Sequence, residues 1–264
     1  MAATSATPAT LPLAGRVAIV TGGSRGIGRA IVIHLHSLGA SVVVNYSSNS
    51  TQAEALLSEL NGPMAEKPRA MAVKANISHP DEVKRLFDAT EGAFASPPHI
   101  FVNCAGILDP KYPTIANTEV EDFDRTFGVN ARGAFLGLRE ASRRVVRGGG
   151  GRIVMLTTSV VGGLFPGYGA YAASKAAVET MTRIAAKELK GTGITANCVA
   201  PGPIASEMFY AGKTEEMVKR IVDACPMGRI GDGKDVAEVV GFLVGDGGEW
   251  VNGQVVRVNG GFVI

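Results

Sequence analysis

Short runs of β-branched and apolar residues alternate with helical stretches along most of this sequence, and this alternation permits very few folds. Seven such runs occur, at 17–20, 41–44, 70–73, 100–102, 152–156, 194–199 and 254–258. Strands that are nearly continuous in apolar residues are buried on both faces, so helices must cover both sides of their sheet. Helical crossovers favour parallel, right-handed connections. We therefore predict a Rossmann-type, doubly wound α/β fold with a seven-stranded parallel sheet.

The length of 264 residues is compatible with one domain or two. No internal repeat and no linker rich in proline, serine or charge divides the chain, so we predict a single domain over residues 15–264. The segment before it, MAATSATPATLPLA, lacks both a long apolar stretch and the arginines of a transit peptide. We interpret residues 1–14 as a flexible leader and expect a cytoplasmic protein.

Composition argues against several classes of function. The net charge is +2 with both signs spread along the chain, which gives no electrostatic case for nucleic acid or a membrane surface as partner. No apolar run approaches the roughly 18 residues that span a bilayer. The three cysteines lack CxxC spacing and the four histidines form no ligand pattern. We expect neither disulfides nor a metal site.

A glycine-rich turn, TGGSRGIGRA, follows the first predicted strand and opens a predicted helix that ends near Leu38. The backbone of such a turn can approach the pyrophosphate of a dinucleotide, whose charge is stabilised by free N–H groups and the helix dipole. The turn also accounts for part of the high glycine content, 34 residues. We assign to cofactor binding Gly22, Ser24, Arg25, Gly26, Ile27 and Gly28.

The end of the second predicted strand carries no carboxylate. An NAD enzyme has Asp or Glu there to bind the ribose hydroxyls, and that charge would repel a 2′-phosphate. Neutral polar side chains stand here instead and can donate hydrogen bonds to a phosphate, while Arg25 can pair with its charge. We therefore predict NADP(H) as the cofactor, contacted at this end by Asn45, Tyr46, Ser47 and Ser48.

Tyr171 and Lys175 lie four residues apart at the start of an alanine-rich helical stretch, which places both side chains on one face of the helix. A free tyrosine, with a pKa of about 10, is poorly matched to proton transfer near neutrality, and a nearby ammonium stabilises its phenolate. Any helix can carry a tyrosine and a lysine at this spacing. The pair becomes a catalytic candidate because it follows a cofactor turn in the same chain.

Four ordered motifs resemble those of the short-chain dehydrogenase/reductase family. They are Thr21 to Gly28, Asn103-Cys104-Ala105-Gly106, Tyr171-Ala172-Ala173-Ser174-Lys175 and Pro201-Gly202. The resemblance covers about residues 15–264. The segments GTGITANCVAPGPIASEMF and GEWVNGQVVRVNGGFVI further resemble the plant branch of NADPH-dependent aldehyde or carbonyl reductase-like proteins, and VVVNYSSNS resembles NADPH-using hydroxynaphthalene reductases.

The resemblance implies further cofactor contacts. Asn76, where the family usually has Asp, and Ile77 would lie against the adenine, and Lys175 and Tyr171 beside the nicotinamide ribose. Cys104, where the family usually has Asn, would fill a packing role. The remaining implied contacts lie on the loops after the fourth and sixth strands, namely Asn103, Ala105, Gly106, Pro201, Gly202, Ile204 and Ser206.

The resemblance also implies the catalytic roles. Tyr171 would exchange a proton with the substrate oxygen, Lys175 would lower its pKa, and Asn130 would complete a proton relay through water. The family serine usually lies thirteen residues before the tyrosine, and this count falls on Thr158, whereas the local pattern TSVVG points to Ser159. We assign the hydroxyl that orients the carbonyl to Ser159 and leave Thr158 open as the alternative.

Apolar and aromatic residues near these motifs predict a pocket for a small, apolar or aromatic carbonyl or alcohol substrate, covered by a lid at about 203–225. The predicted lining is Phe165, Tyr168, Met208, Phe209 and Tyr210. Small residues along the helix of Tyr171 permit close packing between subunits, and family members use this helix in such contacts. We therefore expect a homotetramer, or a homodimer.

The predicted function is NADPH-dependent reduction of an aldehyde or ketone to an alcohol. A 3-oxoacyl carrier-protein reductase is the closest alternative, and an NAD-dependent alcohol dehydrogenase is disfavoured by the neutral residues around Asn45. From another class of function, a nucleotide-binding sensor or scaffold without turnover would also use this fold.

Overall fold

The computed structural model describes residues 11–62 and 67–264. Seven parallel strands form one sheet, as predicted, and their order in the sheet is β3-β2-β1-β4-β5-β6-β7. Each strand lies within two residues of its predicted ends. The strands are β1 Val17–Thr21, β2 Ser41–Tyr46, β3 Ala70–Lys74, β4 Ile100–Asn103, β5 Arg152–Leu156, β6 Thr195–Pro201 and β7 Val255–Val258.

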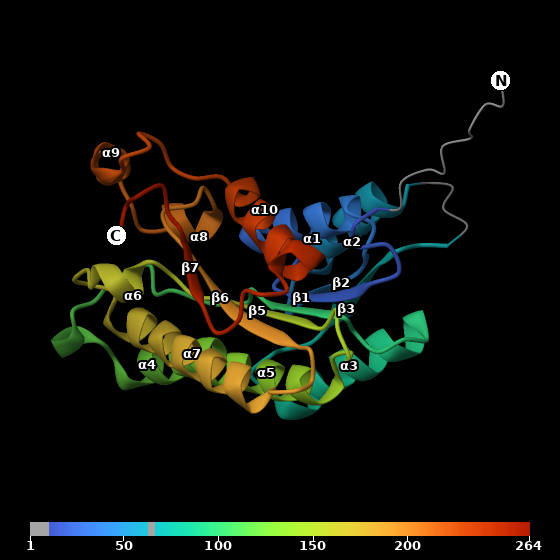
Figure 1. The fold of residues 1–264 in the computed structure, drawn as a ribbon. Coiled ribbons are helices and arrows are strands. Elements are labelled where there is room, and N and C mark those ends of the chain that lie inside the picture. The colour runs from blue at the N-terminus through green and yellow to red at the C-terminus, as the bar shows by residue number, and fades with distance from the viewer. Residues whose placement is uncertain (1–10, 63–66) are drawn as a thin grey trace, which may run out of the picture.

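Helices cover both faces of the sheet (Figure 1). One face carries α1 (Gly26–Ser37), α2 (Ser50–Asn61) and α10 (Gly233–Val244), and the other carries α3 (Pro80–Phe94), α4 (Val120–Phe127), α5 (Ala134–Arg144) and α7 (Gly169–Glu188). Shorter helices lie at the end of the sheet where the strands finish: α6 (Val160–Gly163), α8 (Glu207–Tyr210) and α9 (Glu215–Ala224). No helix in the described part of the chain is long and apolar enough to cross a membrane.

The core forms two layers because successive side chains of a strand point to opposite faces. Val42 and Val44 of β2 pack into the layer with α1, α2 and α10, whereas Val43 between them packs into the layer with α3, α5 and α7. This double burial is the reason that the strands are apolar throughout. Between β1 and β4 the chain order reverses, and in such sheets ligands bind at the carboxyl ends of the strands beside this point.

The folded domain begins before residue 15. Leu13 is fully buried, and its N–H donates to the carbonyl of Leu38 at 2.8 Å. The leader predicted for residues 1–14 is therefore wrong for its last four residues, since the segment from Leu11 packs on the end of α1. Residues 1–10 lie outside the described part of the chain.

Candidate active site

The turn between β1 and α1 has no room for side chains at Gly22 and Gly28. A Cβ on Gly28 would lie 2.2 Å from the carbonyl oxygen of Gly22, and one on Gly22, which has a φ of +61°, would lie 2.9 Å from the Cα of Ala105. The helix begins at Gly26 with no side-chain cap and no acidic residue in its first turn. Its first N–H groups are therefore available to an anion, and the turn fits a dinucleotide pyrophosphate.

Arg25 extends from this turn to the lid. Its guanidinium donates to the Glu207 carboxylate of α8 at 2.7 Å, and both side chains are about two-thirds exposed, at 65% and 67%. An exposed pair of this kind contributes little to stability. Arg25 can therefore exchange this carboxylate for a phosphate at small cost.

Asn45 does not face the predicted cofactor site. It is 1% exposed, and its side-chain amide donates to the carbonyls of Val73 at 3.2 Å and Ala75 at 2.9 Å. The predicted cofactor contact of Asn45 is wrong, because its side chain points inward and connects the end of β2 with β3. Of its neighbours, Tyr46 is half-buried, and Ser47 and Ser48 are exposed and remain candidates.

Asn103 is also turned inward. It is 1% exposed, and its side-chain carbonyl accepts from the hydroxyl of Thr21 at 3.2 Å. The Thr21 oxygen in turn accepts from the N–H groups of Cys104 and Ala105, each at 3.1 Å. Asn103 thus stabilises the ends of β1 and β4. The direct cofactor contact predicted for it does not fit this inward position. Thr21, at the start of the first motif, received no role from the sequence.

The loop after β3 holds the residues predicted near the adenine. The side-chain carbonyl of Asn76 accepts from the N–H of Ser78 at 3.0 Å and forms a local turn before α3. Ile77 is 5% exposed, and a Cβ on Gly133 would lie 2.8 Å from its Cδ1. Ile77 therefore packs chiefly against the protein, and the half-buried Asn76 is the more accessible of the two.

Asn130, Lys175 and Gly106 meet where α7 packs against a π-helical segment, Gly128–Gly133. A Cβ on Gly106 would lie 3.2 Å from Oδ1 of Asn130 and 3.3 Å from Nζ of Lys175. Asn130 is fully buried and binds both backbone groups of Ile107, and its amide also donates to the hydroxyl of Ser174 at 3.2 Å. The site therefore has a fixed asparagine beside the lysine.

Burial controls the protonation of Tyr171 and Lys175. It raises the pKa of Tyr171 to about 12, with the neighbouring Thr158 hydroxyl acting in the opposite direction, and it lowers the pKa of Lys175 to about 8. The predicted lowering of the Tyr171 pKa by Lys175 is not found in the free protein. Instead the Lys175 ammonium donates to the carbonyl of Leu156 at 2.9 Å, and desolvation of the phenolate dominates.

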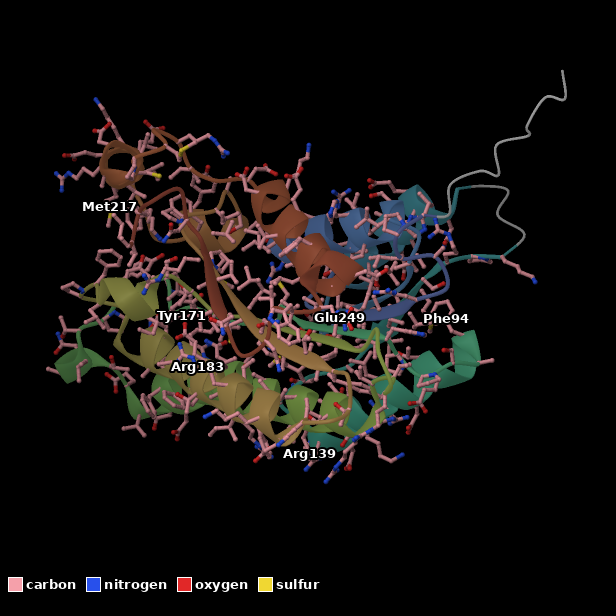
Figure 2. The ribbon with its side chains drawn as sticks, viewed as in Figure 1. Phe94, Arg139, Tyr171, Arg183, Met217 and Glu249 are labelled. Atoms are coloured by element: carbon pink, nitrogen blue, oxygen red, sulfur yellow. The ribbon has the colours of Figure 1, made fainter. Side chains whose placement is uncertain are left out.

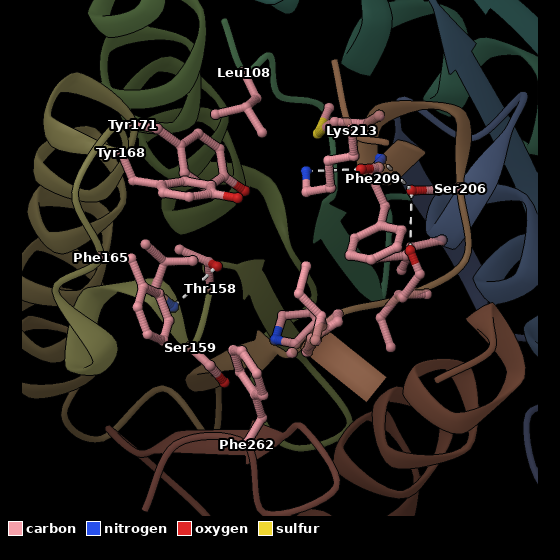
Figure 3. Close-up of a pocket in the computed structure, with 18 of the residues that line it drawn as sticks. Leu108, Thr158, Ser159, Phe165, Tyr168, Tyr171, Ser206, Phe209, Lys213 and Phe262 are labelled. Atoms are coloured by element: carbon pink, nitrogen blue, oxygen red, sulfur yellow. Dashed lines mark hydrogen bonds between the residues drawn. The ribbon is translucent and has the colours of Figure 1, made fainter. Parts of the chain in front are cut away.

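The two candidate hydroxyls after β5 have different surroundings. The Ser159 hydroxyl donates to the carbonyl of Ala200 at 2.9 Å and accepts from the side-chain amide of Asn259 at 3.0 Å. The Thr158 hydroxyl accepts from the N–H of Val160 at 3.2 Å, and Thr158 lies close enough to Tyr171 to oppose the rise of its pKa. Figure 3 shows the Thr158 oxygen on the side of Tyr171 and the Ser159 oxygen on the side of Phe262. The geometry thus favours Thr158, the alternative, over Ser159 as the hydroxyl beside the tyrosine.

A cavity of about 460 Å³ opens beside Tyr171 and is lined mostly by apolar side chains. Phe165, Tyr168, Met208 and Phe209 line it as predicted. Tyr210 does not line it and is 48% exposed, because the short helix α8 turns this side chain outward. In Figure 2, Tyr171 and Met217 of α9 lie at the same end of the molecule, and both line the cavity.

The loop after β6 forms another wall of the same cavity. Pro201, Gly202, Ile204 and Ser206 all line it, as does Ile27 of the glycine turn. The Ser206 hydroxyl also accepts from the N–H of Phe209 at 3.2 Å and so begins α8. The cofactor turn, the predicted nicotinamide edge and the tyrosine therefore surround one space.

Several lining residues have no signal in the sequence. They come from segments far from the four motifs: Leu108 after β4, Lys213, Met217 and Ile221 of the lid, and Phe262 near the C-terminus. Single apolar residues in a chain that is 46% hydrophobic are indistinguishable from core residues. Only the folded arrangement places them at the cavity.

Known proteins resemble this chain both in sequence and in fold. A family model described as enoyl-(acyl carrier protein) reductase matches residues 22–263. A chloroplastic NADPH-dependent aldehyde reductase-like protein of Arabidopsis thaliana is 65% identical, over 96% of each chain. The chloroplastic NADPH-dependent aldehyde reductase 2 of the same plant is 56% identical, over 100% of this chain and 99% of its own.

Among solved structures, a short-chain dehydrogenase of Burkholderia cenocepacia in complex with NADP has a TM-score of 0.87 and 32% identity, and the match covers 95% of this chain and 99% of that one.

The chloroplastic names of both plant relatives contradict the predicted cytoplasmic location. The composition of residues 1–14 is a poor guide to location, because a receptor recognises a targeting signal by more than its composition. The matches over nearly the whole chain show that the chain belongs to the short-chain dehydrogenase/reductase family.

Proposed function

We propose that this protein reduces an aldehyde or ketone to an alcohol with NADPH. The observation that carries the proposal is Tyr171, which lies with Thr158 on the wall of an apolar cavity that also meets the cofactor turn. The plant relatives named NADPH-dependent aldehyde reductases support the same cofactor and substrate class. The chain is accordingly an NADP(H)-dependent oxidoreductase.

The chemistry follows from the two hydroxyls. A carbonyl oxygen placed between Tyr171 and Thr158 receives a hydrogen bond from Thr158 and a proton from Tyr171, while NADPH, when bound, supplies the hydride for the carbonyl carbon. Burial raises the pKa of Tyr171 to about 12, so the residue is protonated at neutral pH, as a general acid must be. In the reverse reaction the same tyrosine accepts the proton from the alcohol.

Lys175 and Asn130 assist Tyr171 without contacting the substrate. Lys175 is 3% exposed and lies one helical turn from Tyr171 on α7, and its burial lowers its pKa to about 8. We expect its ammonium, which lies near Gly106 together with Asn130, to hold the nicotinamide ribose. With its pKa near neutrality, Lys175 is suited to return a proton to Tyr171 after each reduction.

Arg25 is the residue that we expect to select NADPH over NADH. The Arg25→Ala variant is expected to bind NADPH about 10- to 100-fold more weakly, since a hydrogen bond to a charged group contributes about 1.5–3 kcal/mol. Its affinity for NADH, which lacks the 2′-phosphate, is expected to stay nearly unchanged. Titration of cofactor fluorescence measures both values.

Arg29→Ala provides the matched control, because Arg29 lies on α1 and pairs with Glu59 of α2 at 2.5 Å. This variant is expected to bind both cofactors like the wild type. Equal weakening of NADPH and NADH by Arg25→Ala would contradict the assignment and would indicate a general disturbance of the turn.

We propose a homotetramer. Ala185 and Ala186 of α7 pack inside their own subunit, so they are not free for the subunit contact expected from the sequence. Larger apolar side chains on the same layer of helices support the proposal instead: Phe135 of α5 is 46% exposed and Ile184 of α7 is 50% exposed. Light scattering is expected to give four times the chain mass of 27.3 kDa, and a monomeric mass would rule the assembly out.

The chloroplastic relatives support a plastid location for this chain. Import of the full-length protein into isolated chloroplasts tests it, and exclusion from them would contradict it.

A further inference from the structure

Lys213 is a cation on the wall of the apolar cavity with no carboxylate beside it. It lies between α8 and α9 and forms no ion pair within the described part of the chain. Arg220, the other cationic residue of the lining, differs, because it pairs with Glu216 at 2.5 Å. No Asp or Glu is among the lining residues of this cavity. The charge of Lys213 is thus uncompensated.

The Lys213 ammonium is held in place by neutral groups. It donates to the carbonyl of Phe209 at 2.8 Å and to the hydroxyl of Tyr112, and it lies 4.3 Å from the centroid of the Tyr112 ring and 5.0 Å from that of Phe209. An ammonium has three donors, so one N–H remains without a partner among the described residues. Figure 3 shows the nitrogen on the wall opposite Tyr168 and Tyr171.

The contact between Lys213 and Tyr112 depends on an unusual backbone. Tyr112 has a φ of +50°, a region that a bulky residue rarely adopts. Gly212, with a φ of +73°, approaches the neighbouring loop so closely that a Cβ there would lie 2.0 Å from the carbonyl oxygen of Pro110. The Tyr112 hydroxyl donates to the carbonyl of Ala211 at 3.0 Å. The chain is therefore closely packed where it positions this lysine.

Aromatic rings connect Lys213 with the reacting end of the cavity. The centroids of Tyr112 and Tyr168 are 5.1 Å apart, and those of Tyr168 and Tyr171 are 6.4 Å apart. Tyr168 and Tyr171 line the cavity, as does Lys213, so a flat, apolar substrate with its carbonyl at Tyr171 can extend along Tyr168 toward the ammonium. A partly buried charge without a counter-ion favours an anionic partner, because desolvation strengthens their attraction.

We propose that Lys213 determines substrate specificity by binding a carboxylate on the far side of an apolar carbonyl compound. This inference rests on the proposed reductase function and narrows its substrate class. The free N–H of the ammonium donates to a carboxylate oxygen, while the carbonyl to be reduced lies at Tyr171 and Thr158. Lys213 takes no part in proton or hydride transfer.

The experiment compares three aldehydes of similar shape at saturating NADPH: 4-carboxybenzaldehyde, its neutral methyl ester, and benzaldehyde. The wild type is expected to show the highest kcat/KM for the carboxylate. Lys213→Met is expected to lower this value by about 10- to 100-fold, chiefly through KM, with little change for the two neutral aldehydes. Lys213→Arg is expected to retain the preference, and Lys219→Met, an exposed lysine of α9, serves as the matched control.

Two results would overturn the proposal. One is a wild type without preference for the carboxylate, and the other is a Lys213→Met variant that loses activity equally on all three aldehydes, which would give Lys213 only a packing role in the lid.

A calorimetric measurement separates this proposal from the proposed reductase function. Binding of 4-(hydroxymethyl)benzoate and of its methyl ester is measured with protein saturated with NADP⁺. Tighter binding of the acid in the wild type, lost in Lys213→Met, supports the carboxylate site even if no aldehyde is reduced. Equal binding of acid and ester would contradict it.

Discussion

Tyr171→Phe is expected to lower kcat for carbonyl reduction by about 10²- to 10⁴-fold, the range in which a positioned general acid contributes. The variant keeps the ring in the wall of the cavity and removes only the hydroxyl, which is the proposed proton donor. NADPH binding, followed by fluorescence, is therefore expected to persist. Steady-state oxidation of NADPH with a panel of aldehydes and ketones measures the loss.

Tyr210→Phe is the matched control, since Tyr210 is 48% exposed and does not line the cavity. It is expected to be as active as the wild type. A Tyr171→Phe variant with wild-type activity would remove Tyr171 from the mechanism. A wild type that binds NADPH but reduces none of the panel would identify a nucleotide-binding sensor instead of a reductase.

Thr158→Val is expected to reduce kcat by about 10²- to 10³-fold, because it removes a donor aimed at the substrate oxygen while it keeps the shape of the side chain. Thr158→Ser restores a hydroxyl at the same place and is expected to recover much of the activity. The structural basis for this difference is the place of Thr158 on the cavity wall, with its oxygen on the side of Tyr171 (Figure 3). Kinetics with a saturating aldehyde measure the effect.

Ser159→Ala is the comparison that separates the two hydroxyls. It deletes the bonds to Ala200 and Asn259, so the free energy of unfolding is expected to fall by about 1–3 kcal/mol while kcat changes little. Urea unfolding and kinetics on the same samples give both quantities. A large loss of kcat in Ser159→Ala, with Thr158→Val near the wild type, would restore the sequence-based choice of Ser159.

The sheet could be predicted from the sequence because its signal is local and repeated. Each strand is a short apolar run, and burial on both faces requires this composition wherever helices cover both sides of a sheet. The glycine turn could be predicted for a similar reason, since Gly22 and Gly28 lie where a Cβ would collide with backbone. The Tyr171 and Lys175 pair could be predicted from its helical spacing together with the cofactor turn that precedes it in the chain.

The polar residues at the strand ends could not be predicted in the same way. Asn45 and Asn103 have the residue type expected of ligand-binding positions, yet both are 1% exposed and bind neighbouring strands. Successive side chains of a strand point to opposite sides, so the position at which a strand ends decides whether a polar group meets a ligand or the protein. That position is set by the adjacent strands.

The sequence by itself determined the fold, the cofactor turn and the tyrosine that faces the cavity, because each depends on the spacing of residue types within one segment. Only the tertiary structure decided that the Thr158 oxygen rather than that of Ser159 lies on the side of Tyr171, and that Lys213 meets Tyr112, which is 101 residues away along the chain. These arrangements bring the loop after β5 next to α7, and the lid next to the loop after β4. Their geometry depends on how separate elements pack, and no local pattern encodes it.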